Sequence, residues 1–248
     1  MNTQPLRAEI TNELQLRQAL QYPDFQYIYA PEHLLNPSTP HKERIIIVPP
    51  VFLADCEQYT CKRLEELREI GFSHALAHTA DHIMPIKTAN LTLHGGSRLN
   101  ITNGFSANFF TDQGFTDIIL SPELTAGRIN ALLTSIPKGI ISYGKLPLMI
   151  TRRCPINDGK PCNNGKSCGR TITDRRGKTI VPICSNMVEL LNPDTLNIAD
   201  KLSDFPTADF FLLKFTVEKD IINITEKFTS GEKPTGDFTR GLYYRGVE

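Results

Sequence analysis

Short apolar runs alternate with helix-like segments along most of the chain, and this alternation constrains the fold more than any other feature. Residues 44–50, 117–121 and 209–216 are near-continuous apolar runs, as expected of strands buried on both faces of a parallel sheet. Amphipathic segments such as residues 55–71 lie between such runs and predict helices. About seven or eight strands of this kind predict an α/β fold, a TIM-type β/α barrel, complete or partial, with a doubly wound sheet as the alternative.

The length and composition are those of one ordinary globular domain. With 248 residues, of which 40% are hydrophobic, the chain can bury a sizeable core. We expect one barrel-like domain over residues 1–248, with a cysteine-rich insertion at 152–184 and an irregular tail at 229–248. The formal net charge is zero, so no overall field attracts nucleic acid or an anionic membrane.

No targeting or membrane segment is evident in the sequence. No apolar run approaches the roughly 20 residues that a membrane-spanning helix needs. The polar start, MNTQPLRAEITNELQ, lacks the apolar centre of a signal peptide. The sequence therefore predicts a cytoplasmic protein without a membrane partner, in a compartment where clustered cysteines favour metal or redox roles over disulfides.

The insertion holds four of the six cysteines of the chain. They are Cys154, Cys162, Cys168 and Cys184. Residues 171–184 contain two β-rich runs around a turn centred near Arg176, which predicts a hairpin with Cys184 beside Cys168. Four converging thiolates suit a zinc ion or an iron–sulfur cluster. Unligated cysteines in an ordinary loop are the alternative.

The usual nucleotide and protease signatures are missing. Residues 159–167 resemble a phosphate-binding loop, but five residues separate the glycines where four are required, one of them is proline, and no helix pattern follows. There is no H-E-x-x-H and no G-x-S-x-G. Ser142 and Lys145 match S-x-x-K, but that motif requires a helix and their flanks are β-rich.

In a β/α barrel, functional residues follow the strands. The positions selected in this way are His33, Pro49, His78, His94, Asn103, Glu123 and the residues after Ile150. Glu123 is either a general base or substrate anchor, or a carboxylate favoured by the N-terminus of the next helix. His74, His78 and His82 would share a face on one helix, but FSHALAH reads as a strand entering a loop, which favours separate histidines.

Two polar groups of residues are further candidates. Alternation places Arg98, Asn100 and Thr102 on one face, where they would either bind a ligand or be satisfied by structural hydrogen bonds. Arg152 and Arg153 precede the insertion, which is locally basic. The other basic residues in it are Arg170, Arg175, Arg176 and Lys178. Such a segment predicts contact with RNA phosphate or a small anionic substrate, or else a solvated face.

Several motifs resemble the collagenase-like peptidase family, long classed as of unknown catalytic type. The most specific is YGKLPLMITRRCP, which leads into the insertion. It is accompanied, in family order, by LNITN, LSPELT, TDRRGKTIVPIC and FTRGLYYRG. The matches run from about residue 90 to the end and resemble the second half of the long form of the family. The resemblance implies either a partner chain or an earlier barrel portion.

The resemblance also implies a β/α barrel and two recorded activities. Some members are named proteases or collagenases. Others carry out oxygen-independent hydroxylation of a tRNA wobble uridine, of a ribosomal RNA cytidine using prephenate, or of a quinone precursor. We expect the hydroxylation or RNA-modification activity, with a peptidase, or a zinc-stabilised non-catalytic or RNA-binding subunit, as alternatives.

Site roles follow from the resemblance residue by residue. A cluster, [4Fe–4S] rather than zinc, is expected on Cys154, Cys162, Cys168 and Cys184. Substrate-binding roles carry over onto Asn100, Asn103, Arg152 and Lys214, the last as the counterpart of a lysine in the K-I-E-G-R strand of the family. We expect Glu123, with His78 or His94, to handle protons.

Overall fold

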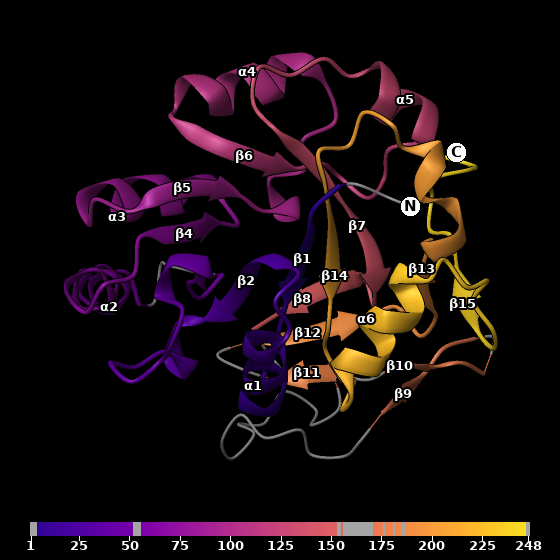
Figure 1. Cartoon of the computed structure of the whole chain (residues 1–248), viewed down its shortest axis with the longest axis horizontal. Coiled ribbons are helices and arrows are strands. Elements are labelled where there is room, and N and C mark those ends of the chain that lie inside the picture. Colours follow the sequence, from indigo (N-terminus) through magenta and orange to yellow (C-terminus); the bar gives the residue numbers. More distant parts are fainter. Residues whose placement is uncertain are drawn as a thin grey trace.

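The chain forms a β/α barrel (Figure 1). The computed structural model describes residues 4–51, 56–152, 155, 171–175, 177–180, 182–184 and 187–246, with only the main chain of Cys184. The barrel strands are β1 (Leu6–Glu9), β2 (Phe25–Pro31), β3 (Ile45–Val48), β4 (His74–Ala77), β5 (Thr92–Gly95), β6 (Phe115–Ile119), β7 (Lys138–Gly144) and β14 (Phe210–Lys214).

The barrel closes through its last strand. Consecutive strands from β1 to β7 pair in parallel, and β14 pairs in parallel with both β1 and β7. Leu6 lies opposite Phe211 on one side, and Gly139 lies opposite Phe210 on the other. The predicted TIM-type barrel is confirmed in its complete form, and the doubly wound alternative is wrong.

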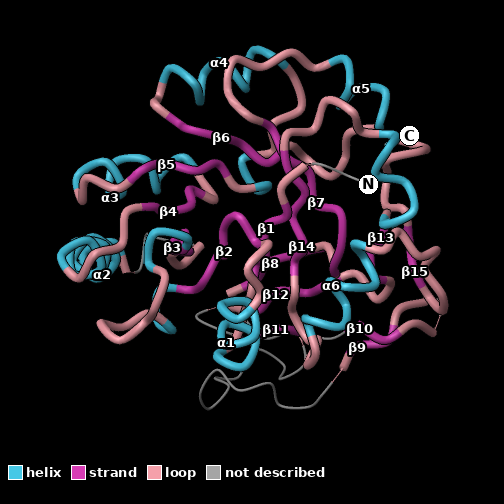
Figure 2. Tube along the Cα trace, viewed as in Figure 1, coloured by secondary structure: helices cyan, strands magenta, loops and turns pink. Residues whose placement is uncertain are grey.

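Helices cover the outside of the barrel (Figure 2). They are α1 (Glu13–Gln21), α2 (Glu57–Glu69), α3 (Ile83–Thr88), α4 (Gly104–Asp112), α5 (Ala126–Ala131) and α6 (Ile221–Thr229). Short 3-10 helices occupy Glu32–Leu34, Lys42–Arg44, Ala80–His82, Ser97–Leu99 and Ala199–Asp204. Several helices begin at a polar cap: Asn12, Asn103, Thr125 and Asp220 each accept a hydrogen bond from a main-chain N–H of the first turn.

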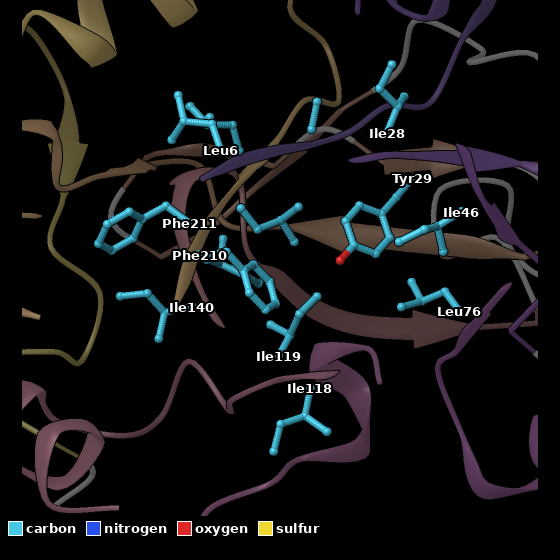
Figure 3. Packing of buried hydrophobic residues seen from close by; sticks show 14 of the residues in the cluster. Leu6, Ile28, Tyr29, Ile46, Leu76, Ile118, Ile119, Ile140, Phe210 and Phe211 are labelled. Atoms are coloured by element: carbon cyan, nitrogen blue, oxygen red, sulfur yellow. The ribbon is translucent and has the colours of Figure 1, made fainter. Parts of the chain in front are cut away.

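Alternation along the strands separates an inner from an outer core. Figure 3 shows Tyr29, Ile46, Leu76, Ile119 and Phe210 pointing toward one another inside the barrel. Their neighbours Leu6, Ile28, Ile118 and Phe211 point away, toward the surrounding helices. Both sets are buried, which explains why the strands are apolar on both faces.

The part of the chain that connects β7 to β14 contains a small antiparallel sheet. This sheet lies below β1 and β14 in the view of Figure 1. It consists of β8 (Pro147–Thr151), β11 (Pro182–Cys184) and β12 (Val188–Leu191), with β12 in the centre. The predicted hairpin in the insertion is confirmed by β9 (Ile172–Thr173) and β10 (Thr179–Ile180), whose pairing is symmetrical about position 176.

Strand β12 forms because Val188 and Leu190 pair with strands on both sides and are buried. Such pairing depends on the packed sheet and not on local propensity alone. The tail is irregular apart from β15 (Phe238–Thr239), which pairs with β13 (Thr195–Asn197). Among the described helices, none has the length and apolar character to cross a membrane.

Candidate active site

A cavity of about 560 Å³ lies at the mouth of the barrel, where the strands end. Its wall includes the residues that end or follow β1, β2, β3, β4 and β14, and the start of α2. Ile183 of β11, Met187 directly before β12 and Glu189 of β12 complete it. We call this space the mouth cavity. It occupies the position where β/α barrels carry their reactive groups.

Two ion pairs lie in the wall of the mouth cavity. Lys214 of β14 pairs with Glu9 of β1, and both side chains are buried. Arg98, which follows β5, pairs with Glu189 of β12 at 2.6 Å. The second pair therefore joins the rim of the barrel to the inserted sheet.

Three buried polar atoms of the wall have no hydrogen-bond partner among the described residues. They are Glu32 Oε2, His78 Nδ1 and Thr216 Oγ1. No other buried side-chain nitrogen or oxygen among the described residues lacks a partner, and all three residues line the mouth cavity. Buried polar groups are almost always paired, so this concentration distinguishes the mouth cavity from the rest of the described interior.

Burial shifts the protonation of these groups in opposite directions. It raises the pKa of Glu32 to about 7, against the lowering effect of the nearby Arg63. Burial, together with the positive charges of Arg98 and Lys214, holds the pKa of His78 well below its usual value. Glu32 therefore populates both states near neutral pH, whereas His78 is an uncharged imidazole.

A second polar group fills the lower interior of the barrel. Arg7 donates to Asp117 at 2.8 Å and to Tyr29 Oη at 2.9 Å. Nδ1 of His94 lies 3.0 Å from both carboxylate oxygens of Asp117, and Nε2 lies 3.0 Å from Nδ1 of His74. We call these five residues the interior network. Each has a partner, as a structural network requires.

The structure divides the predicted catalytic and binding residues into two groups. His78 and Lys214 line the mouth cavity, as do His33 and Pro49. His94 does not, because it is the third residue of β5 and faces the interior network.

The remaining predicted site residues lie outside the cavity wall. Glu123 is exposed after β6. Asn100 accepts a hydrogen bond from Ser121 Oγ at 2.6 Å, and Asn103 caps α4. Arg152 is exposed at the end of β8. These positions follow strands, but their side chains stay on the outer rim of the barrel.

The regularly spaced histidines do not form a cluster. His74 lies in β4, and His82 lies in the 3-10 helix Ala80–His82. Nδ1 of His82 accepts from the main-chain N–H groups of His78 and Thr79. The prediction of separate histidines is confirmed, and within the described part of the chain no group of three or more metal-binding side chains is present.

The predicted cluster ligands Cys154, Cys162 and Cys168 lie outside the described residues, as do Arg153, Arg170 and Arg176. Cys184 is the last residue of β11, and its main chain pairs with Val188 of β12. Its neighbour Ile183 lines the mouth cavity.

Three acidic residues of the cavity wall were not selected from the sequence. Glu9 is a charged residue at the end of an apolar strand, and Glu32 follows β2 directly, so strand-end position was a usable signal for both. Glu189 gave no such signal, because it does not follow a predicted strand. Only the folded small sheet brings it to Arg98.

The fold and the mouth cavity define the chain as a β/α-barrel protein whose mouth cavity is partly walled by the segment inserted after β7. Residues 40–170 match the model of Peptidase family U32. Since this match covers more than half of the 248 residues, the chain belongs to Peptidase family U32.

Comparisons with individual proteins add one structural similarity at low sequence identity. No curated protein matches the chain. Among solved structures, it is similar to one described as the structure of the U32 peptidase Mk0906, with 12% sequence identity and a TM-score of 0.48. That match covers 87% of this chain and 94% of the other.

Proposed function

We propose that this protein holds an iron–sulfur cluster and carries out oxygen-independent hydroxylation of an RNA base or of a small anionic molecule in the mouth cavity. The observation that carries the proposal is the cavity itself, with its buried polar atoms that lack partners. A volume of about 560 Å³ is in the range that holds one small molecule or one extruded base. The three-chain helix of collagen is too thick to enter such a space.

The chemistry of the donor set supports the cluster. Four thiols, Cys154, Cys162, Cys168 and Cys184, match the number of ligands that a [4Fe–4S] cluster uses. The main chain of Cys184 adjoins a residue of the cavity wall. When bound, such a cluster supplies electron transfer or a binding place for the oxygen donor. Zinc suits the same four thiolates and would make the insertion purely structural.

The side chains of the wall would bind and orient the substrate. Arg98 and Lys214 each use one hydrogen bond in their ion pairs, which leaves further N–H donors for an anionic group. The uncharged imidazole of His78 can donate or accept a hydrogen bond without bringing a charge. The inserted sheet, through Met187 and Ile183, places apolar surface against the substrate.

The test compares RNA from cells that lack this protein with RNA from cells in which it is restored. Digestion to nucleosides and mass spectrometry should show a nucleoside heavier by an oxygen atom in the restored cells only. Cys184→Ser should abolish this product. Cys61→Ser is the matched control, because Cys61 lies on the outer helix α2 and not in the cavity wall, and it should leave the product unchanged.

Peptidase activity is the second candidate. The observation that favours it is the presence of a thiol and a hydroxyl, Cys56 and Thr216, in the cavity wall, since these are nucleophile types. Against it, Thr216 Oγ1 makes no hydrogen bond to a described residue, so no base activates it. Cleavage of gelatin by the purified protein, with an unchanged nucleoside profile, would favour the peptidase over the hydroxylation.

A further inference from the structure

Glu32 differs from the other carboxylates of the mouth cavity in forming no ion pair with a cation of the described part of the chain. Glu9 is paired with Lys214, and Glu189 is paired with Arg98. Glu32 forms no ion pair with any described residue, although it is only 5% exposed. Burying a carboxyl group without a partner costs free energy. A purely structural glutamate at this position would be expected to have one.

The main chain around Glu32 is held in place without the help of its carboxyl group. The carbonyl oxygen of Glu32 accepts hydrogen bonds from Arg63 Nη2 at 3.2 Å and from the N–H of Leu35 at 3.1 Å. Arg63 also donates to the carbonyl of Leu35 at 2.6 Å. This cation of α2 therefore fixes the loop after β2, and the carboxyl group remains available to a ligand.

We propose that Glu32 is the residue of the mouth cavity that exchanges a proton with the bound substrate. This inference rests on the proposed function, in which the substrate reacts in that cavity. It replaces Glu123, which is exposed outside the cavity wall, and it assigns to His78 a hydrogen-bonding role without proton transfer.

Glu32 and His78, which both line the mouth cavity, have pKa values displaced in opposite directions, as acid–base chemistry requires. The pKa of Glu32 is about 7, so a proton can leave or return near neutral pH. His78 cannot supply one, because its pKa is well below the usual value. Its Nδ1 also packs against Gly96, where an added Cβ would lie 2.8 Å away. Pairs of groups with pKa values displaced in opposite directions identify acid and base roles.

The charged surroundings of Glu32 come from several elements. Arg63 approaches from α2, and His33 is the next residue in the chain. Across the cavity wall lie the Glu9–Lys214 and Arg98–Glu189 pairs. The two charges within each pair offset one another. Arg63 is therefore the main group that opposes the rise in the pKa of Glu32 caused by burial.

The proton transfer itself needs no further reagent. The O–H bond of the carboxylic acid breaks, and the proton bonds to a lone pair on an oxygen or nitrogen of the substrate. The electron pair of the broken bond stays on the carboxylate, and nothing is oxidised or reduced. The ligand group that suits this position is therefore an uncharged lone-pair donor, such as the carbonyl oxygen or ring nitrogen of a base.

The first measurement needs neither substrate nor activity. In anaerobically purified protein with ¹³C-labelled glutamate side-chain carboxyls, NMR spectra recorded across the acid and neutral range should show a resonance that titrates near pH 7 and is missing in Glu32→Gln. If the Glu32 resonance titrates at the ordinary value of a glutamate, about 4.3, the inference is overturned whatever the RNA shows.

The second measurement asks whether the proton is used. In cells that carry Glu32→Gln, the hydroxylated nucleoside should fall at least tenfold while the iron content of the purified variant equals that of the wild type. Glu32→Asp should restore part of the product. Glu69→Gln, an exposed glutamate at the end of α2, is the matched control and should change nothing.

The outcomes separate this inference from the proposed function. A Glu32→Gln variant with unchanged product would overturn the role of Glu32 and leave the hydroxylation standing. Absence of the nucleoside from wild-type cells, with the Glu32 resonance still titrating near pH 7, would remove the hydroxylation and leave a proton-exchanging site in the cavity supported.

Discussion

The interior network and the mouth cavity both contain charged side chains of one barrel, but they differ in how completely those side chains are hydrogen-bonded. In the interior network, Asp117 has Arg7 and His94 as partners. In the mouth cavity, Glu32, His78 and Thr216 each keep a buried polar atom without one. A satisfied network stabilises the fold, whereas unsatisfied groups cost stability unless a ligand contacts them. The contrast indicates which of the two is structural and which is a site.

The interior network should be the more sensitive of the two regions to mutation. Asp117→Ala leaves the guanidinium of Arg7 buried beside aromatic rings and without its carboxylate. Removing one partner of a buried ion pair costs about 3–5 kcal/mol in the free energy of unfolding. Urea denaturation at pH 7 measures it. The exposed Asp112→Ala should change the value by less than about 0.5 kcal/mol, and an equally small effect at Asp117 would contradict a structural role.

The packing around the interior network gives a second test. A side chain at Gly139 would overlap the ring of Phe210, whose face lies against the guanidinium of Arg7. Gly139→Ala should therefore destabilise the protein by about 1–3 kcal/mol. Gly127→Ala is the control, because a Cβ there meets nothing within 4 Å and alanine favours the helix α5. Equal stability of the two variants in thermal unfolding would show that the interior is loosely packed.

The loss of folding stability at acid pH should be caused mainly by protonation of Asp117. Burial tends to raise the pKa of Asp117, but its contacts with His94 and Arg7 outweigh this and hold the pKa below its usual value. The stabilisation is then complete above the unfolded value of about 3.9 and is lost as the pH falls through the folded value. Unfolding curves of Asp117→Asn should lack this dependence. If the variant loses stability at acid pH as the wild type does, that loss is caused by other carboxylates.

The opposite sign of pH dependence is expected for the mouth cavity. The pKa of Glu32 is raised to about 7, so the folded state keeps the proton of Glu32 to higher pH than the unfolded state. Wild-type stability should decrease as the pH rises from about 4.3 to about 7, with a slope of at most about 1.4 kcal/mol per pH unit. Glu32→Gln should remove this decrease and equal or exceed the wild type at pH 8. A variant that is less stable than the wild type at pH 8 would show that Glu32 has a structural partner.

The sequence was informative about the barrel because parallel strands buried on both faces leave long apolar runs. It did not identify β12, where pairing with β8 and β11 decides the structure and no local pattern indicates that pairing. Strand-end position found His78 but also suggested Glu123 and Asn103, because it does not specify which way a side chain points. Lys214 came only from the family resemblance. His94 was selected in the same way, but its side chain contacts the interior network and not the mouth cavity.

The mouth cavity could not be predicted as a whole. Its wall joins residues from β1, β2, β14 and the insertion, which are up to about two hundred positions apart in the chain. A glutamate after a strand, such as Glu32, looks like an ordinary surface residue until its burial and lack of a partner are known. These are properties of the packed molecule and not of any local segment.

Metal and sulfide analysis of the anaerobically purified protein tests the central claim most directly. The account predicts about four irons and four sulfides per chain, with visible absorbance near 400 nm that disappears in Cys184→Ser and persists in Cys61→Ser. Zinc alone, at one ion per chain in protein handled without oxygen, would contradict it and leave the mouth cavity without the redox centre that the proposed hydroxylation requires.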